Sequence, residues 1–248
     1  MTVRSALTLA AAVAVASPAM AKSLKSVPAR LDPAKAYVLV EVGPVEGTKA
    51  QGQITLARYD QVNADIRGLG RAKDAPGSSK GDPHETTGAA LVKAEARRLY
   101  LLEVEPDFWV VEGANGTAFS LGSAGVTLEA GKVTDLGVAS VANDYLDGDG
   151  PEKLTVGKLA KIALLGPFTG GALKPKPVPA AATFRPRTDG DLPVPESLKG
   201  NLVAATWSGP VKFGNHLGGF VNRLGGRKAR TGTAGSAGEI TAASNPGS

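Results

Sequence analysis

Short segments in which apolar and polar positions alternate follow one another between residues 36 and 141. In "AYVLVEV" (36–42), three valines fall on one face of the chain, opposite Tyr37, Leu39 and Glu41. A two-residue period bounded by Gly, Pro and Asn is the pattern of β-strands joined by close turns. Further strands are predicted over residues 53–60, 65–70, 97–106, 107–113, 125–131 and 132–141.

Several short strands with close turns are typical of an all-β domain, and we expect an antiparallel β-sandwich of the immunoglobulin or prealbumin type over residues 36–145. A parallel α/β fold is disfavoured, because no helix-length segment separates the strands. Residues 71–90 have no apolar period and indicate a loop. The run "FWVV" predicts a central strand with Trp109 in the core; stacking of Trp109 on a carbohydrate is the alternative. Asn-Gly at 115–116 predicts a hairpin turn.

The pattern changes after residue 145. Residues 146–172 are expected to form an acidic turn and a short helix, because apolar positions in 152–165 recur at spacings near three and four. Residues 173–222 indicate a Pro-rich connector with one extra strand at 201–209, anchored by Trp207. The basic segment 223–248 is expected to be disordered, since it is rich in Gly, Ala and Ser and buries too little apolar surface to offset the entropy of ordering.

Residues 1–21 have the order of a bacterial export signal. Arg4 precedes the apolar run 6–16, and Ala19-Met20-Ala21 is a cleavage site of the A-x-A type. We therefore expect an exported protein, periplasmic or secreted, whose mature chain begins with a lead segment at 22–35. The chain has no cysteine, so disulfides do not stabilise it. Its net charge is only +5, and the aromatic residues do not interleave with the basic tail, so nucleic acid is not an expected partner.

Residues 30–145 resemble small exported bacterial β-sandwich domains of unknown function. The resemblance rests on the opening "LDPAKAYVLVEV" and on the block "VTLEAGKVTDLGV". In that block an apolar strand ends in the turn Ala130-Gly131 and the next strand reaches Leu136-Gly137. The resemblance implies the fold and implies no activity, because those families have none assigned.

The stretch "DYLDGDGPEK" (144–153) is a weak candidate for a calcium site. Its carboxylates, oxygen ligands of the kind that Ca²⁺ prefers, are Asp144, Asp147, Asp149 and Glu152. An EF-hand alignment places Tyr145 and Val156 at the first and last ligand positions, where neither side chain binds calcium. An acidic turn beside a helix N-terminus explains the same residues and is favoured.

The sequence also offers two hydrolase hypotheses. Ser120 in "AFSLG" is similar to a nucleophile elbow, and the chain order Ser120, then Asp189 or Asp191, then His216 matches an α/β-hydrolase. The elbow requires a helix after the serine, whereas a strand pattern follows it here. The alternative pair of catalytic carboxylates is drawn from Glu103, Glu105 and Asp107. A metal site at His84 is disfavoured, because the only other histidine is far away in the sequence.

No nucleophile, base and metal ligands converge in this sequence. We therefore predict a non-catalytic cell-envelope accessory or binding module, with an envelope protein or a glycan as partner and no cofactor; calcium at the acidic turn is the alternative. The alternatives are a secreted hydrolase and a peripheral membrane protein that binds through residues 152–168 and the basic tail.

Overall fold

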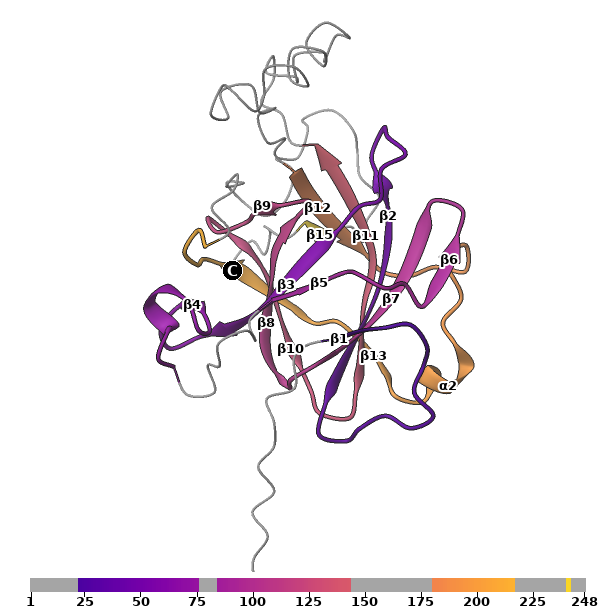
Figure 1. Ribbon diagram of the computed structural model, residues 1–248, viewed down its shortest axis with the longest axis horizontal. Coiled ribbons are helices and arrows are strands. Elements are labelled where there is room, and N and C mark those ends of the chain that lie inside the picture. Colours follow the sequence, from indigo (N-terminus) through magenta and orange to yellow (C-terminus); the bar gives the residue numbers. More distant parts are fainter. Residues whose placement is uncertain (1–21, 76–83, 144–179, 217–239, 242–248) are drawn as a thin grey trace, which may run out of the picture.

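The computed structural model describes residues 22–75, 84–143, 180–216 and 240–241. Two β-sheets face each other in this part of the chain, which confirms the predicted mainly β sandwich (Figure 1). The strand order of the first sheet is β1-β7-β2-β11-β12-β15, with β6 beside β7 and β13 beside β11. Its strands are β1 (Lys22–Leu24), β2 (Ala36–Val45), β6 (Val92–Ala94), β7 (Arg97–Val104), β11 (Val133–Asn143), β12 (Ala180–Arg185), β13 (Leu202–Ala204) and β15 (Ile240–Thr241).

The strand order of the second sheet is β14-β10-β8-β3-β4, with β5 beside β3 and β9 beside β8. Its strands are β3 (Ile54–Asp60), β4 (Asp65–Ile66), β5 (His84–Thr86), β8 (Asp107–Ala114), β9 (Thr117–Ala118), β10 (Ser123–Leu128) and β14 (Trp207–Val211). The 3₁₀-helix η1 (Gly70–Ala72) and the short helix α2 (Glu196–Lys199) lie outside the sheets. Within the described ranges, neither is long and apolar enough to span a bilayer.

The core between the sheets follows the predicted alternation. The valines of β2 and the inward residues of β7 and β11 pack against Leu56, Trp109 and Val126 of the second sheet. Trp109 is 0% exposed, and its indole N–H donates to the carbonyl oxygen of Glu105 at 2.9 Å. Because β8 lies between β3 and β10, the prediction of a central strand is confirmed. The burial of Trp109 excludes the alternative in which its ring stacks on a sugar.

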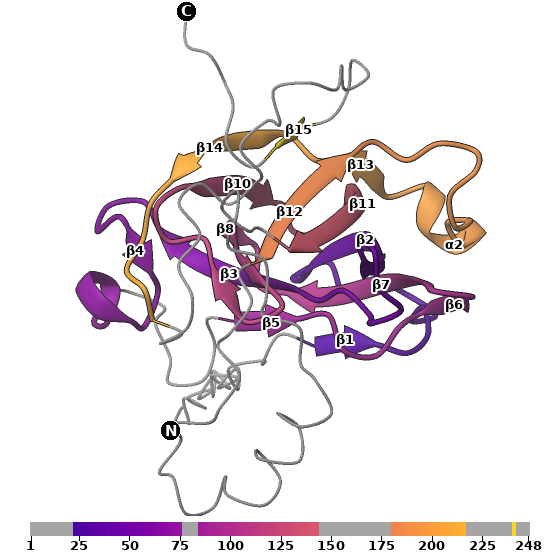
Figure 2. The ribbon, with the colours of Figure 1, turned by 90° about the horizontal axis from the view of Figure 1, so that it is seen from above.

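The outer face of the first sheet is also buried. Tyr37, Leu39 and Leu99 on that face pack against Leu192 and Leu198 in a second hydrophobic cluster. The covering segment includes α2, which lies on the side of the first sheet that faces away from the second (Figure 2). This cover explains why β2 is buried on both faces along most of its length.

Residues 173–222 contribute more to the sandwich than the predicted connector with one extra strand. Within this range, β12 and β13 belong to the first sheet and β14 to the second. The segment 201–209, predicted as one strand, is divided between two sheets, so the chain crosses the sandwich at residues 205–206.

The pairing of the strands also differs in places from a purely antiparallel sandwich. Strand β11 runs parallel to β2 and to β13, so the first sheet is mixed.

Other segments can be compared with their predictions. Ile240 and Thr241, in the segment predicted to be disordered, pair with β12 as β15. The predicted loop at 71–90 contains the end of η1 and also β5. The predicted turn is confirmed, because Asn115 and Gly116 have φ of 47° and 78°, the positive values of a type I′ hairpin.

Candidate functional site

The four carboxylates of the calcium hypothesis, Asp144, Asp147, Asp149 and Glu152, lie outside the described residues, as does the predicted helix at 152–165. Among the residues that the structure does describe, no group of three or more His, Asp or Glu side chains is placed to hold a metal ion. His84 lies on β5, paired through the backbone with Ala57 of β3.

The residues of the serine-hydrolase hypothesis take part in separate contacts. Ser120 is buried in the turn between β9 and β10, and its carbonyl oxygen accepts a hydrogen bond from Phe213 N–H at 3.1 Å. A strand follows it, where an elbow requires a helix. The ring of His216 lies 2.9 Å from Asp65, and Asp191 binds Arg185. These contacts do not form a Ser–His–Asp triad.

The three carboxylates of the second hydrolase hypothesis also have separate partners. Glu103 accepts a hydrogen bond from the hydroxyl of Tyr37 at 3.2 Å. Glu105 forms an ion pair with Lys35. Asp107, on the other sheet, binds the guanidinium groups of Arg58 and Arg67. Each carboxylate is held by its own neighbour, so the structure does not present them as a pair facing one substrate.

The most extensive polar arrangement is centred on Glu41, whose side chain is 0% exposed on β2. One carboxylate oxygen accepts from Arg187 Nη1 at 2.8 Å and from the backbone N–H of Leu192 at 2.8 Å. The other oxygen accepts from Arg97 Nη1 at 3.1 Å. A buried carboxylate is tolerated only when it is paired and hydrogen-bonded, and Glu41 meets both conditions. Its position ties the segment 187–192 to the first sheet.

Arg187 extends this arrangement to β11. Its guanidinium binds Asp135 twice, with Nε–Oδ2 at 3.1 Å and Nη2–Oδ1 at 3.2 Å. Asp135 also accepts from Gly137 N–H at 2.8 Å, where the register between β11 and β2 shifts. Gly137 has φ of 80°, and a Cβ there would clash with the carbonyl oxygen of Arg185. Glycine is therefore required at this bulge.

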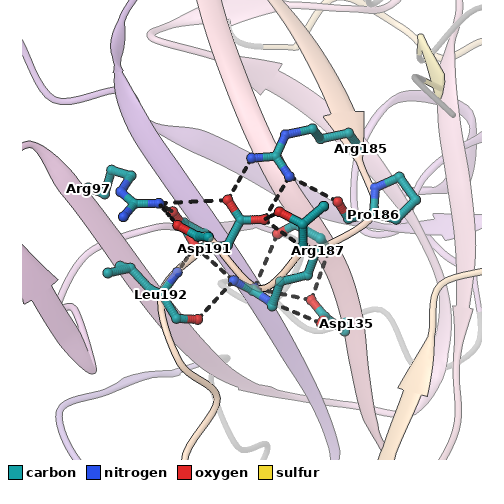
Figure 3. Close-up of polar contacts among 11 residues, drawn as sticks. Arg97, Asp135, Arg185, Pro186, Arg187, Asp191 and Leu192 are labelled. Carbon is teal, nitrogen blue, oxygen red and sulfur yellow. Dashed lines mark hydrogen bonds and ion pairs between the residues drawn. The ribbon is translucent and has the colours of Figure 1, made fainter. Parts of the chain in front are cut away.

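Arg185 forms the exposed end of the arrangement and is bound to the buried carboxylate of Asp191 (Figure 3). The pair is bidentate, at 2.7 and 2.6 Å, and Thr188 donates to the same carboxylate. Hydrogen bonds from Arg185 lower the pKa of Asp191 far below its ordinary range, although burial opposes this, and Thr188 adds to the lowering. The hydrogen bond to Asp191 raises the pKa of Arg185. Both groups are therefore charged near neutral pH.

We call this set the Glu41 cluster. It comprises the carboxylates Glu41, Asp135 and Asp191 and the guanidiniums Arg97, Arg185 and Arg187. Three negative and three positive groups sum to zero charge. Such a neutral cluster of planar, mutually bonded groups fixes the geometry of the surface next to it.

A cleft of about 290 Å³ opens beside this cluster, where β13 leaves β11 and the chain crosses to the second sheet. We call it the Trp207 cleft. Trp207 is half-buried and packs against Phe184, with ring centroids 4.9 Å apart and an angle of 47° between the rings. The cleft is lined by Asp135, Leu136, Gly137, Phe184, Arg185, Pro186, Arg187, Leu202, Ala204, Ala205 and Trp207.

A second cavity, of about 330 Å³, lies between the turn after β2 and the β8–β9 turn. It is bounded by Asn143 and Ala180, which flank residues 144–179 outside the described ranges. Its described walls are Val45, Thr48, Ala50, Asn115, Gly116, Thr117, Asn143 and Ala180, with no aromatic or ionised side chain among them.

A second polar site joins residues 214–216, beyond the end of β14, to the β4–η1 turn. Asp65 accepts hydrogen bonds from the N–H groups of Ile66, Arg71 and Gly214 and lies 2.9 Å from the ring of His216. Burial raises the pKa of Asp65, but these hydrogen bonds outweigh it and lower the pKa to about 2. The site fastens residues 214–216 to the turn and lines neither cavity.

Sequence reasoning missed the Glu41 cluster and the role of Trp207. Two signals pointed to the cluster: Glu41 interrupts an apolar strand, and the run "RPRTDGD" (185–191) places two arginines and two aspartates in a Pro-rich segment. No local signal pointed to the position of Trp207 in a cleft. Comparison of the chain with protein-family models, with curated proteins and with solved structures found no match.

Proposed function

We propose that the protein is an exported, non-catalytic binding module of the bacterial cell envelope and that the Trp207 cleft is its binding surface. Export is the expectation from residues 1–21. The observation that carries the proposal is a half-buried tryptophan in a cleft whose charged wall is already fully paired.

Two properties of the cleft support binding. Trp207 offers a large rigid surface at little cost in side-chain entropy, and Phe184 supports it from within the core. The wall beside it is held by the Glu41 cluster, so little ordering is needed when a ligand arrives. Concave sites with an aromatic lining and a few polar groups are the usual form of a ligand pocket.

The state of the charged groups supports a non-catalytic role. A general base must release its hydrogen bonds and take up a proton near the working pH. The lowered pKa of Asp191 keeps this carboxylate ionised and bound to Arg185, and Asp135 is held by Arg187. The cleft wall therefore offers paired groups that suit recognition.

Co-sedimentation with isolated envelopes of the producing bacterium tests this function. The mature chain, residues 22–248, should bind saturably, and Trp207→Ala should bind at least about tenfold more weakly, as expected for loss of a central aromatic contact. Trp207→Phe, which keeps a ring against Phe184, should retain most of the binding. Val62→Ala is the matched control, because Val62 is 93% exposed in the β3–β4 turn. Absence of binding, or equal binding by Trp207→Ala in a folded state, would refute the proposal.

A further inference from the structure

We propose that the ligand of the Trp207 cleft is a carbohydrate, with one sugar ring stacked on Trp207 and its hydroxyl groups facing Arg185. This inference rests on the function proposed above and names the ligand class for the same site. It follows from three features of the cleft: its apolar floor, its paired charges and the remaining N–H donors of Arg185 at its rim.

The floor of the cleft is apolar and partly aromatic. Phe184 and Trp207 lie in contact, and Leu136, Leu202 and Ala205 complete the apolar lining. A pyranose ring presents a face of C–H groups that packs on an aromatic ring, while its hydroxyls point outward around the edge. The volume of about 290 Å³ lies at the lower end of ligand pockets, which suits one ring of a chain and leaves the neighbouring rings outside.

The charge of the cleft selects against the other envelope ligands. A phosphate or nucleic-acid chain is attracted by uncompensated arginines, whereas Arg185 and Arg187 are each bound to a carboxylate here. An acyl chain would cover the remaining N–H donors of Arg185 without offering them an acceptor, which is unfavourable. A neutral, hydroxyl-rich ligand with one apolar face is compatible with both the floor and the rim.

The rim retains hydrogen-bonding capacity although its charges are paired. A guanidinium has five N–H donors, and Arg185 uses three of them, two on Asp191 and one on the carbonyl oxygen of Pro186. The carboxylate of Asp191 is 3% exposed and also accepts two hydrogen bonds from Thr188, so the capacity left at the rim is that of Arg185. The side chain of Arg185 is 41% exposed, against 12% for Arg187. Arg185 is therefore the group that meets ligand hydroxyls, and Arg187 holds the wall behind it.

The first experiment separates glycan from protein and lipid partners. Isolated envelopes are digested with a non-specific protease or extracted with chloroform–methanol, and binding of the mature chain to the insoluble material left by each treatment is measured. We expect binding to survive both treatments and to remain sensitive to Trp207→Ala. Loss of binding after digestion would identify a protein partner and loss after extraction a lipid. Either result overturns the carbohydrate inference while leaving the cleft as the binding surface. If Trp207→Ala does not weaken binding to untreated envelopes, the proposed function itself is overturned.

The second experiment places the glycan at Trp207. The chain has two tryptophans, so Trp109→Phe leaves Trp207 as the only indole reporter. Glycan solubilised by sonication from the digested and extracted envelopes should shift the emission of Trp207 saturably. The matched variant Trp207→Phe retains only the buried Trp109, whose emission should not change. A glycan that binds without moving the Trp207 emission would overturn the stacked geometry.

Discussion

Replacing Arg187 by methionine should destabilise the protein more than any exposed charge substitution. The change removes the contacts of Arg187 with Glu41 at 2.8 Å and with Asp135 at 3.1 and 3.2 Å. Glu41, which is 0% exposed, is left with one Arg97 contact and one backbone N–H, and the cluster acquires a net charge of about −1. Removal of one partner from a buried ion pair costs about 3–5 kcal/mol.

The assay is urea unfolding of residues 22–248 followed by far-UV circular dichroism. With a denaturant slope of about 1–3 kcal/mol per molar urea, the midpoint of Arg187→Met should fall by roughly 1 M or more. Lys199→Met is the matched control, because Lys199 pairs with Glu196 at 2.6 Å and both side chains are more than half exposed. An exposed pair contributes at most about 1 kcal/mol.

A double-mutant cycle isolates the pairing from general loss of packing. Glu41→Gln removes the buried negative charge that Arg187→Met leaves behind, so the double variant should be more stable than the sum of the two single losses predicts. A loss below about 1 kcal/mol for Arg187→Met, or strict additivity with Glu41→Gln, would refute the assignment of Arg187 as the group that compensates Glu41.

Three further predictions concern other parts of the fold. Because the pKa of Asp65 is lowered to about 2, Asp65 stabilises the fold above its unfolded pKa of about 3.9, and this stability is lost as the pH falls through about 2. Asp65→Asn should abolish this part of the acid sensitivity, which amounts to at most about 2 kcal/mol between pH 5 and 2. Urea titrations over that pH range measure it, and parallel stability curves for the two proteins would contradict the prediction. Gly137→Ala should lower the free energy of unfolding by more than about 2 kcal/mol, because the positive φ and the clash with the carbonyl oxygen of Arg185 combine. Gly116→Ala, where φ is also positive but space is open, should lower it by only about 1 kcal/mol, and equal losses would contradict the clash. Trp109→Leu should cost at least about 2 kcal/mol in the same assay, since the indole is fully buried and loses its hydrogen bond to Glu105; a loss below about 1 kcal/mol would show that the core closes over it.

The strands and the core were largely predictable, because they depend on local alternation. The period in residues 36–42 correctly placed the three valines of β2 on one face, which the fold turns toward the second sheet, and the Asn115-Gly116 dipeptide correctly located a hairpin. The burial of the opposite face was not predictable from periodicity. It depends on Leu192 and Leu198, which reach the sheet from far along the chain.

The candidate site was not predictable for the same reason. Glu41 and Arg187 are separated by 146 positions in the sequence, and no local pattern relates them. Trp207 was expected to anchor a single strand, but the crossing between the sheets places it on β14 at the mouth of a cleft. Pairing of charges across such distances is a property of the folded chain, and single-sequence reasoning captured only the composition of the segment 185–191.

The most direct test of the Trp207 cleft as the binding surface is acrylamide quenching of Trp207 in the Trp109→Phe variant, measured with and without isolated envelopes. Our account predicts that bound envelopes protect the indole, so that the quenching constant falls severalfold and returns to its free value when the protein is released. An unchanged quenching constant for protein that has demonstrably sedimented with the envelopes would contradict the account, because binding would then take place on another face.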